Sequence, residues 1–127
     1  MYKISVPIIL SEIERQGKEG IVKKLRELDA ERVFLALGVR SVEKEEIEKT
    51  TALLKKETEY FHSLGFEVGV WLWTFMASGD HAFTHMSMVS VEETVCPDML
   101  CPTYESYVAD TAAYVGRLAE TGVDIIM

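Results

Sequence analysis

The chain has 127 residues with 13 basic and 21 acidic side chains, which gives a formal net charge of −8. Phosphate-rich partners require clustered lysine and arginine, so this balance argues against nucleic acid and anionic membrane surfaces as partners. No run of about 18 apolar residues occurs, and the N-terminus lacks a signal-peptide pattern. We therefore expect no membrane segment and a cytoplasmic location. The two cysteines, Cys96 and Cys101, do not make a disulfide framework.

The first predicted elements are a strand near residues 3–10, a helix over 18–28 and a second strand near 32–37. Both strands are nearly continuous in apolar residues, which is typical of a sheet buried on both faces. The helix between them is amphipathic, because its apolar residues recur at helical spacing. Its buried face is expected to contain Ile21, Leu25 and Leu28.

The second predicted helix begins with Ser41 as its N-cap and ends before Gly65, which suits the residue that follows a helix. Glu43, Glu45 and Glu46 lie near the N-terminus of this helix, where the helix dipole favours negative charge. The rest of its charged surface is interpreted as a solvated face. Its buried stripe is expected to contain Ile47, Leu54, Phe61 and Leu64.

A third strand near 67–75 precedes a segment, 76–102, that is too long for an ordinary connection between strand and helix. Segments of this kind are usually functional or disordered. A third helix begins after Thr103, and Gly122 separates it from a fourth strand at 123–127. The buried face of this helix is expected to contain Tyr107, Thr111, Tyr114 and Leu118.

This alternation of strands and helices predicts an α/β fold with parallel strands and right-handed crossovers. Four βα repeats correspond to half of a (β/α)8 barrel, because the complete barrel takes roughly 250 residues. We therefore expect residues 1–127 to form a single incomplete β/α-barrel domain.

Alternation along the strands assigns side chains to a helix-facing side and an inward side. The first inward residue of each strand is charged: Lys3, Arg32, Glu67 and Asp124. Buried charges need partners, so we expect these four to form a polar plug at the N-terminal end of the barrel. The alternative is that strand starts are charged only because they are exposed. The residues expected to face the helices are Ile4, Val6, Ile8, Val33, Leu35, Leu37, Val68, Val70, Leu72, Val123, Ile125 and Met127, with Ile126 inward.

Three stretches resemble glycoside-hydrolase-type TIM barrels. Residues 31–38, ERVFLALG, resemble their second strand, and residues 64–73, LGFEVGVWLW, resemble their third. Cys101-Pro102, then a helix, then TGVDIIM at 121–127, resemble the approach to their fourth strand. The resemblance covers most of the chain and concerns architecture more than chemistry. It implies an acidic residue at the C-terminal end of the fourth strand, and catalytic carboxylates beyond residue 127.

Active sites of such barrels lie at the C-terminal ends of the strands. Trp73 lies there, and an indole face can stack on a sugar ring, whereas Trp71 fits barrel packing. Asp80, His81 and His85 follow in the long segment, and their side chains can hydrogen-bond hydroxyl groups or transfer protons. The alternatives are barrel packing for Trp73 and a solvated loop for the other three.

Metal and thiol chemistry have weaker support. His81 and His85 with Cys96 and Cys101 are zinc-ligand types, but their order is not that of a familiar zinc finger. A nucleophilic cysteine needs a basic partner, and the sequence does not place one. We expect no cofactor and no bound metal.

The sequence thus predicts a glycoside-hydrolase-like protein, of which this chain is an N-terminal fragment that is inactive alone. It would contribute Trp73, Asp80, His81 and His85 to a carbohydrate-binding cleft. The alternatives are a non-catalytic half-barrel assembly module and a TIM-barrel enzyme of another class, such as a lyase or a metal-dependent hydrolase. Because four parallel strands leave two open edges, we expect self-association as a two-fold dimer; the rival is a monomer with 76–102 folded over the inner face.

Overall fold

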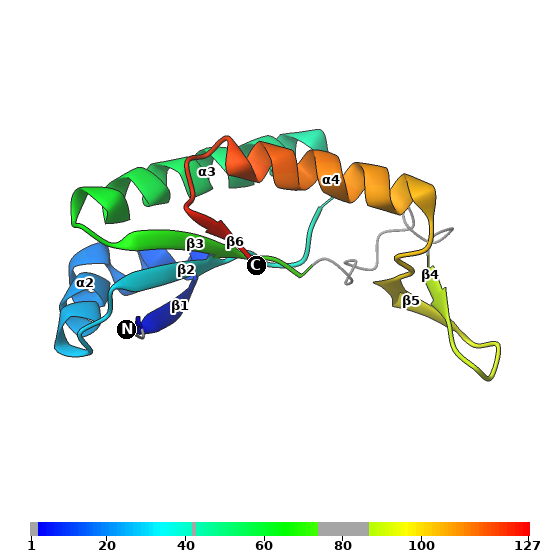
Figure 1. Ribbon diagram of the computed structural model, residues 1–127, viewed down its shortest axis with the longest axis horizontal. Helices are drawn as coiled ribbons and strands as arrows, with labels where there is room; N and C mark the ends of the chain where they lie inside the picture. Colours follow the sequence, from blue (N-terminus) through cyan, green and yellow to red (C-terminus); the bar gives the residue numbers. More distant parts are fainter. Residues whose placement is uncertain (1–2, 42, 74–86) are drawn as a thin grey trace.

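A computed structural model describes residues 3–41, 43–73 and 87–127 of the chain. Its main sheet has four parallel strands in the order β1-β2-β3-β6, which is also their order along the chain (Figure 1). The predicted α/β class with four parallel strands is therefore confirmed. The strands are β1 (Ser5–Ile9), β2 (Arg32–Ala36), β3 (Glu67–Trp71) and β6 (Ile125–Ile126).

The helices pack on one face of this sheet. Between β1 and β2 lie η1 (Leu10–Glu12), α1 (Ile13–Gln16) and α2 (Lys18–Glu27), whereas α3 (Lys44–Ser63) connects β2 to β3 and α4 (Glu105–Ala119) precedes β6. Their buried side chains share a single hydrophobic core with the helix-facing residues of the strands. Its members include Ile8, Ile21, Leu25, Val33, Leu35, Leu37, Leu54, Phe61, Val68, Val70 and Leu118. Within the described residues, no helix is both long and apolar enough to cross a membrane.

Two details at the helix ends differ from expectation. The N-cap of α3 is Glu43 rather than Ser41. The Ser41 hydroxyl instead accepts a hydrogen bond from the Glu43 N–H at 3.1 Å, so it organises the turn before the helix. Leu28 is 56% exposed because α2 ends at Glu27, before the predicted buried stripe reaches it. As predicted, Gly65 follows its helix in a left-handed conformation, with φ +85°.

The faces of the first three strands agree with the prediction, but β6 is reversed. Gly69 pairs with Ile125 and Val70 with Ile126, and paired residues of neighbouring strands project to the same face. Val70 is buried in the helix-facing core, so Ile126 faces the helices and Ile125 faces away from them. The predicted faces of Ile125 and Ile126 were therefore wrong, whereas Val123 packs against the core as predicted. Ile125, Ile126 and Met127 are apolar in succession, so alternation had little to distinguish their two faces.

The described part of segment 76–102 contains an antiparallel hairpin that the sequence analysis did not predict. Its strands are β4 (Ser87–Val89) and β5 (Val95–Leu100). Figure 1 shows the hairpin extending away from the main sheet, near the N-terminus of α4. Its strands are short, and an irregularity in register between Ser87 and Met88 interrupts their pairing. Both features weaken the alternating pattern from which strands are recognised.

Candidate functional site

The sheet face opposite the helices, here called the open face, carries an apolar hollow at the carboxyl ends of the strands. The volume of this hollow is about 550 Å³. Ile9, Ala36 and Trp71, which end β1, β2 and β3, all contribute to its lining. We call it the aromatic hollow because two indoles form part of its wall. Its lining residues are Pro7, Ile9, Ala36, Leu37, Gly38, Val39, Trp71 and Trp73.

Trp71 and Trp73 are held beside the hollow by the backbone of β3. The Trp71 carbonyl accepts a hydrogen bond from the Leu37 N–H at 3.0 Å. The Leu72 N–H donates to the Met127 carbonyl at 2.8 Å, which continues the ladder on the other side of the strand. Trp71 is 39% exposed and Trp73 is 50% exposed. The structure therefore places Trp73 at the carboxyl end of the sheet, as the sequence predicted, with much of its indole accessible.

The other three predicted substrate-binding residues cannot be placed. Asp80, His81 and His85 lie outside the described residues. The site described below therefore rests on Trp73 and its neighbours.

Arg40, just beyond β2, forms part of the rim beside Trp73 and was not singled out by the sequence analysis. Its guanidinium forms an ion pair with the Asp110 carboxylate and lies 4.9 Å from the centre of the Tyr114 ring. Burial lowers the pKa of Arg40 and raises the pKa of Tyr114. The available signal was a lone arginine shortly after a strand, but its partners on α4 are 70 or more residues away in the sequence.

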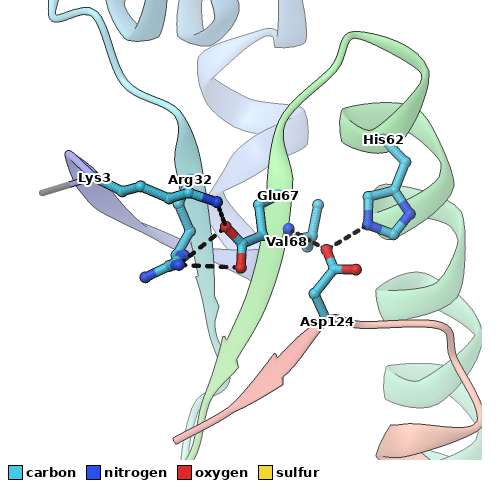
Figure 2. A network of polar contacts seen from close by, with 6 residues as sticks. All are labelled: Lys3, Arg32, His62, Glu67, Val68 and Asp124. Atoms are coloured by element: carbon cyan, nitrogen blue, oxygen red, sulfur yellow. Dashed lines mark hydrogen bonds and ion pairs between the residues drawn. The ribbon is translucent and has the colours of Figure 1, made fainter. Parts of the chain in front are cut away.

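The opposite, amino end of the open face carries a polar cluster (Figure 2). The Glu67 carboxylate accepts a hydrogen bond from Lys3 Nζ at 2.5 Å and two from Arg32 Nη2 at 3.0 and 2.9 Å. These bonds, first from Lys3 and then from Arg32, hold the pKa of Glu67 below its ordinary value. Three of the four charges predicted for the polar plug therefore pair with one another.

Asp124, the fourth predicted member of the plug, lies on the other face of the sheet. Its carboxylate accepts a hydrogen bond from the Val68 N–H at 2.8 Å, and His62 Nε2 on α3 lies 2.7 Å from the same oxygen (Figure 2). The Val68 N–H and then His62 keep the pKa of Asp124 below its usual value. Asp124 is at the amino end of the sheet, as predicted, but its face was wrong. Its partners are a backbone N–H and a helix side chain, which strand alternation does not reveal.

Neither cysteine forms a disulfide. Cys101 Sγ lies 3.0 Å from Thr103 Oγ1, and hydrogen bonds with the Thr103 side chain and backbone lower the pKa of this thiol. Among the residues that the structure describes, no group of three or more His, Cys, Asp or Glu side chains could hold a metal ion. The histidines of the alternative zinc hypothesis, His81 and His85, are not among those residues.

Comparisons with family models, with curated proteins and with solved structures find no match to this chain. The interpretation of the aromatic hollow therefore rests on its residues and their geometry.

Proposed function

We propose that this chain forms half of a (β/α)8 barrel of the glycoside-hydrolase type, with the aromatic hollow contributing to a carbohydrate-binding cleft. The observation that carries the proposal is the winding of the sheet. The four parallel strands follow chain order, and α2, α3 and α4 share one core on one face. Doubly wound folds instead place helices on both faces and reverse the strand order at a switch point. A barrel has a single outer layer of helices, which is what this arrangement supports.

The position of the hollow supports ligand binding. Barrel enzymes bind their substrates at the carboxyl ends of the strands, and the aromatic hollow lies at that end. A half-exposed indole offers a flat apolar surface on which one face of a sugar ring can stack. Trp73 is suited to this role, whereas Trp71 lies deeper, at the end of β3. Asp80, His81 and His85 follow Trp73 in the chain, and we propose that they supply hydrogen bonds to the sugar hydroxyl groups.

The catalytic carboxylates of such an enzyme would come from other strands of the barrel. Glycoside hydrolysis uses two carboxyl groups, one on each side of the scissile bond. On the described part of the open face, Glu67 is the one carboxylate, and it lies at the amino end. The Glu67 carboxylate already accepts hydrogen bonds from Lys3 and Arg32 at that end of the sheet. We therefore assign Glu67 a structural role.

This function can be tested by titrating the chain with each member of a panel of neutral oligosaccharides and measuring the heat of binding by calorimetry. We expect one member of the panel to bind the wild-type chain, and Trp73→Ala to weaken its binding about tenfold, which corresponds to about 1.4 kcal/mol. Trp73→Phe keeps an aromatic face and should retain most of the affinity. Tyr104→Ala, which removes an exposed aromatic side chain at the start of α4, is the matched control and should bind normally. Absence of binding across a broad panel would overturn the proposal.

A second proposal concerns what covers the open face. Ile9 at 56% and Met127 at 60% are exposed beside the two tryptophans, although a barrel buries such residues inside. Within the described sheet, β1 and β6 are edge strands. Four further parallel strands would close the sheet into an eight-stranded barrel. We propose that the open face is a half-barrel interface and that the 127-residue chain, prepared alone, covers it by forming a two-fold dimer.

A further inference from the structure

Arg40 connects two elements at the carboxyl end of the sheet that are far apart in sequence. It lies four residues after the end of β2, in the connection to α3. Its side chain is only 12% exposed, although it carries a full charge. Three of its partners lie on consecutive turns of α4, a helix that comes after β3 in the chain. They are the Asp110 carboxylate, the Thr111 hydroxyl at 3.5 Å and the Tyr114 ring at 4.9 Å.

These contacts use the features that distinguish arginine from lysine. The planar guanidinium can pair with a carboxylate through one edge while its face lies over an aromatic ring. Burial of a charge is costly unless it is paired and hydrogen-bonded. The contacts with Asp110 and Tyr114 therefore hold Arg40 in one position, and through Arg40 they hold α4 against the end of β2.

Three of these residues also border a small gap beside Trp73. Arg40, Thr111 and Tyr114 line a gap of only about 10 Å³ together with Leu37, Gly38, Leu72 and Trp73. Trp73 itself lies two residues beyond the last residue of β3. Because the regular strand has already ended, side-chain packing contributes more to the position of Trp73 than it does for Trp71.

We propose that Arg40 is a positioning residue: by clamping α4 to the end of β2, it holds the Trp73 indole in the orientation that forms the wall of the aromatic hollow. The role in sugar binding rests on the proposed function. The role in ordering Trp73 does not, and it can be measured without any ligand.

The experiment uses the Trp71→Phe variant as background, because the chain has two tryptophans and Trp73 is then the single indole. In this background, Arg40→Met removes the charge and the planar fork while keeping a long side chain. We expect a shift of the Trp73 emission maximum and about a twofold change in its quenching by acrylamide. Binding of the oligosaccharide identified for the wild-type chain should weaken about tenfold. Arg40→Lys keeps the charge without the fork and should give intermediate values.

Arg26→Met is the matched control. Arg26 also lies over an aromatic ring, that of Phe66, at 4.5 Å, and it donates a hydrogen bond to the Leu64 carbonyl at 2.5 Å. These contacts are at the amino end of the sheet, so this variant should leave the emission and quenching of Trp73 unchanged.

The possible outcomes separate the two proposals. If Arg40→Met does not give the far-ultraviolet circular dichroism of a folded chain, Asp110→Asn, which removes only the ion pair, provides the test. Emission and quenching of Trp73 that stay unchanged in a folded Arg40 or Asp110 variant would overturn the positioning role. A changed Trp73 signal in a protein that binds no oligosaccharide would support the positioning role and overturn only the sugar-binding proposal.

Discussion

The Phe34 ring lies so close to Gly69 that a Cβ atom at position 69 would come within 2.3 Å of it. The two residues are register partners on β2 and β3, and both project to the open face. Phe34 is only 8% exposed despite lying on that face, because its ring covers the space that a side chain at position 69 would fill. The absence of a side chain at Gly69 thus leaves room for the Phe34 ring on the open face, between the polar cluster and the aromatic hollow.

The first prediction follows from this contact. Gly69→Ala should reduce the free energy of unfolding by about 1–3 kcal/mol, since the ring or the strand must shift to admit the methyl group. Gly116→Ala on α4 is the control, because a Cβ there meets nothing within 4 Å. It should be neutral or stabilise the chain by up to about 1 kcal/mol. Urea denaturation measures both variants, and equal stabilities for the two would contradict the packing described for Phe34.

The second prediction concerns Asp124. Its pKa is lower in the folded chain than in the unfolded one because the Val68 N–H and His62 favour the carboxylate. The stabilisation is therefore complete above the pKa of an unfolded aspartate, about 3.9, and is lost as the pH falls through the lower, folded value. Asp124→Asn should cost about 1 kcal/mol at neutral pH, a modest amount because the side chain is 41% exposed.

The same variant should show less loss of stability in acid than the wild type does. Unfolding curves between pH 2 and pH 7 measure the difference. Glu19→Gln on the surface of α2, which removes the same charge from an exposed position, is the control and should follow the wild type. A difference between Asp124→Asn and wild type that is constant across this pH range would show that the carboxylate charge is unimportant.

The third prediction concerns an ion pair on the helix side. Glu57 of α3 is completely buried, and Lys18 Nζ of α2 lies 2.7 Å from each of its carboxylate oxygens. Lys18→Met leaves that carboxylate without its cation and should cost about 3–5 kcal/mol. Lys18→Met combined with Glu57→Gln removes the buried charge and should recover part of this loss. Thermal unfolding of the single and the double variant measures this difference. Equal destabilisation of the two would show that the charge of the buried Glu57 carboxylate does not cause the loss.

The fourth prediction tests the half-barrel interface. We expect sedimentation equilibrium of the 127-residue chain to show a dimer that dissociates on dilution. Trp71→Lys should shift this equilibrium towards the monomer, because it places a charge on the surface that the dimer buries. Val108→Lys, on an exposed position of α4, is the control. A monomer at every concentration, without binding of a hydrophobic dye, would contradict the proposed interface.

The fifth prediction concerns activity. The purified 127-residue chain should hydrolyse aryl glycosides no faster than buffer does, because the described open face carries no pair of carboxylates at its carboxyl end. Liberation of nitrophenol from a panel of nitrophenyl glycosides is the measurement. Turnover by the wild-type chain would show that catalytic groups lie within it, and loss of that turnover in Asp80→Asn would identify one of them.

Local sequence was sufficient for the elements that depend on local chemistry. The α/β class, the four parallel strands and the turn at Gly65 were predicted correctly, because apolar periodicity and the left-handed preference of glycine act over a few residues. The position of Trp73 at the carboxyl end was also predicted, because Trp73 follows the last residue of β3 in the chain. The aliphatic residues Val68 and Val70 mark the helix-facing side of that strand, so Trp71 was assigned to the opposite side.

Tertiary structure alone decided the features that depend on distant partners. The face of Asp124 depends on a backbone N–H and on His62, and the apolar residues around it fit either register. The role of Arg40 depends on α4, and Thr111 is 71 positions away. Such contacts form only when the chain brings the carboxyl end of β2 beside α4, and no periodicity within a single element encodes them.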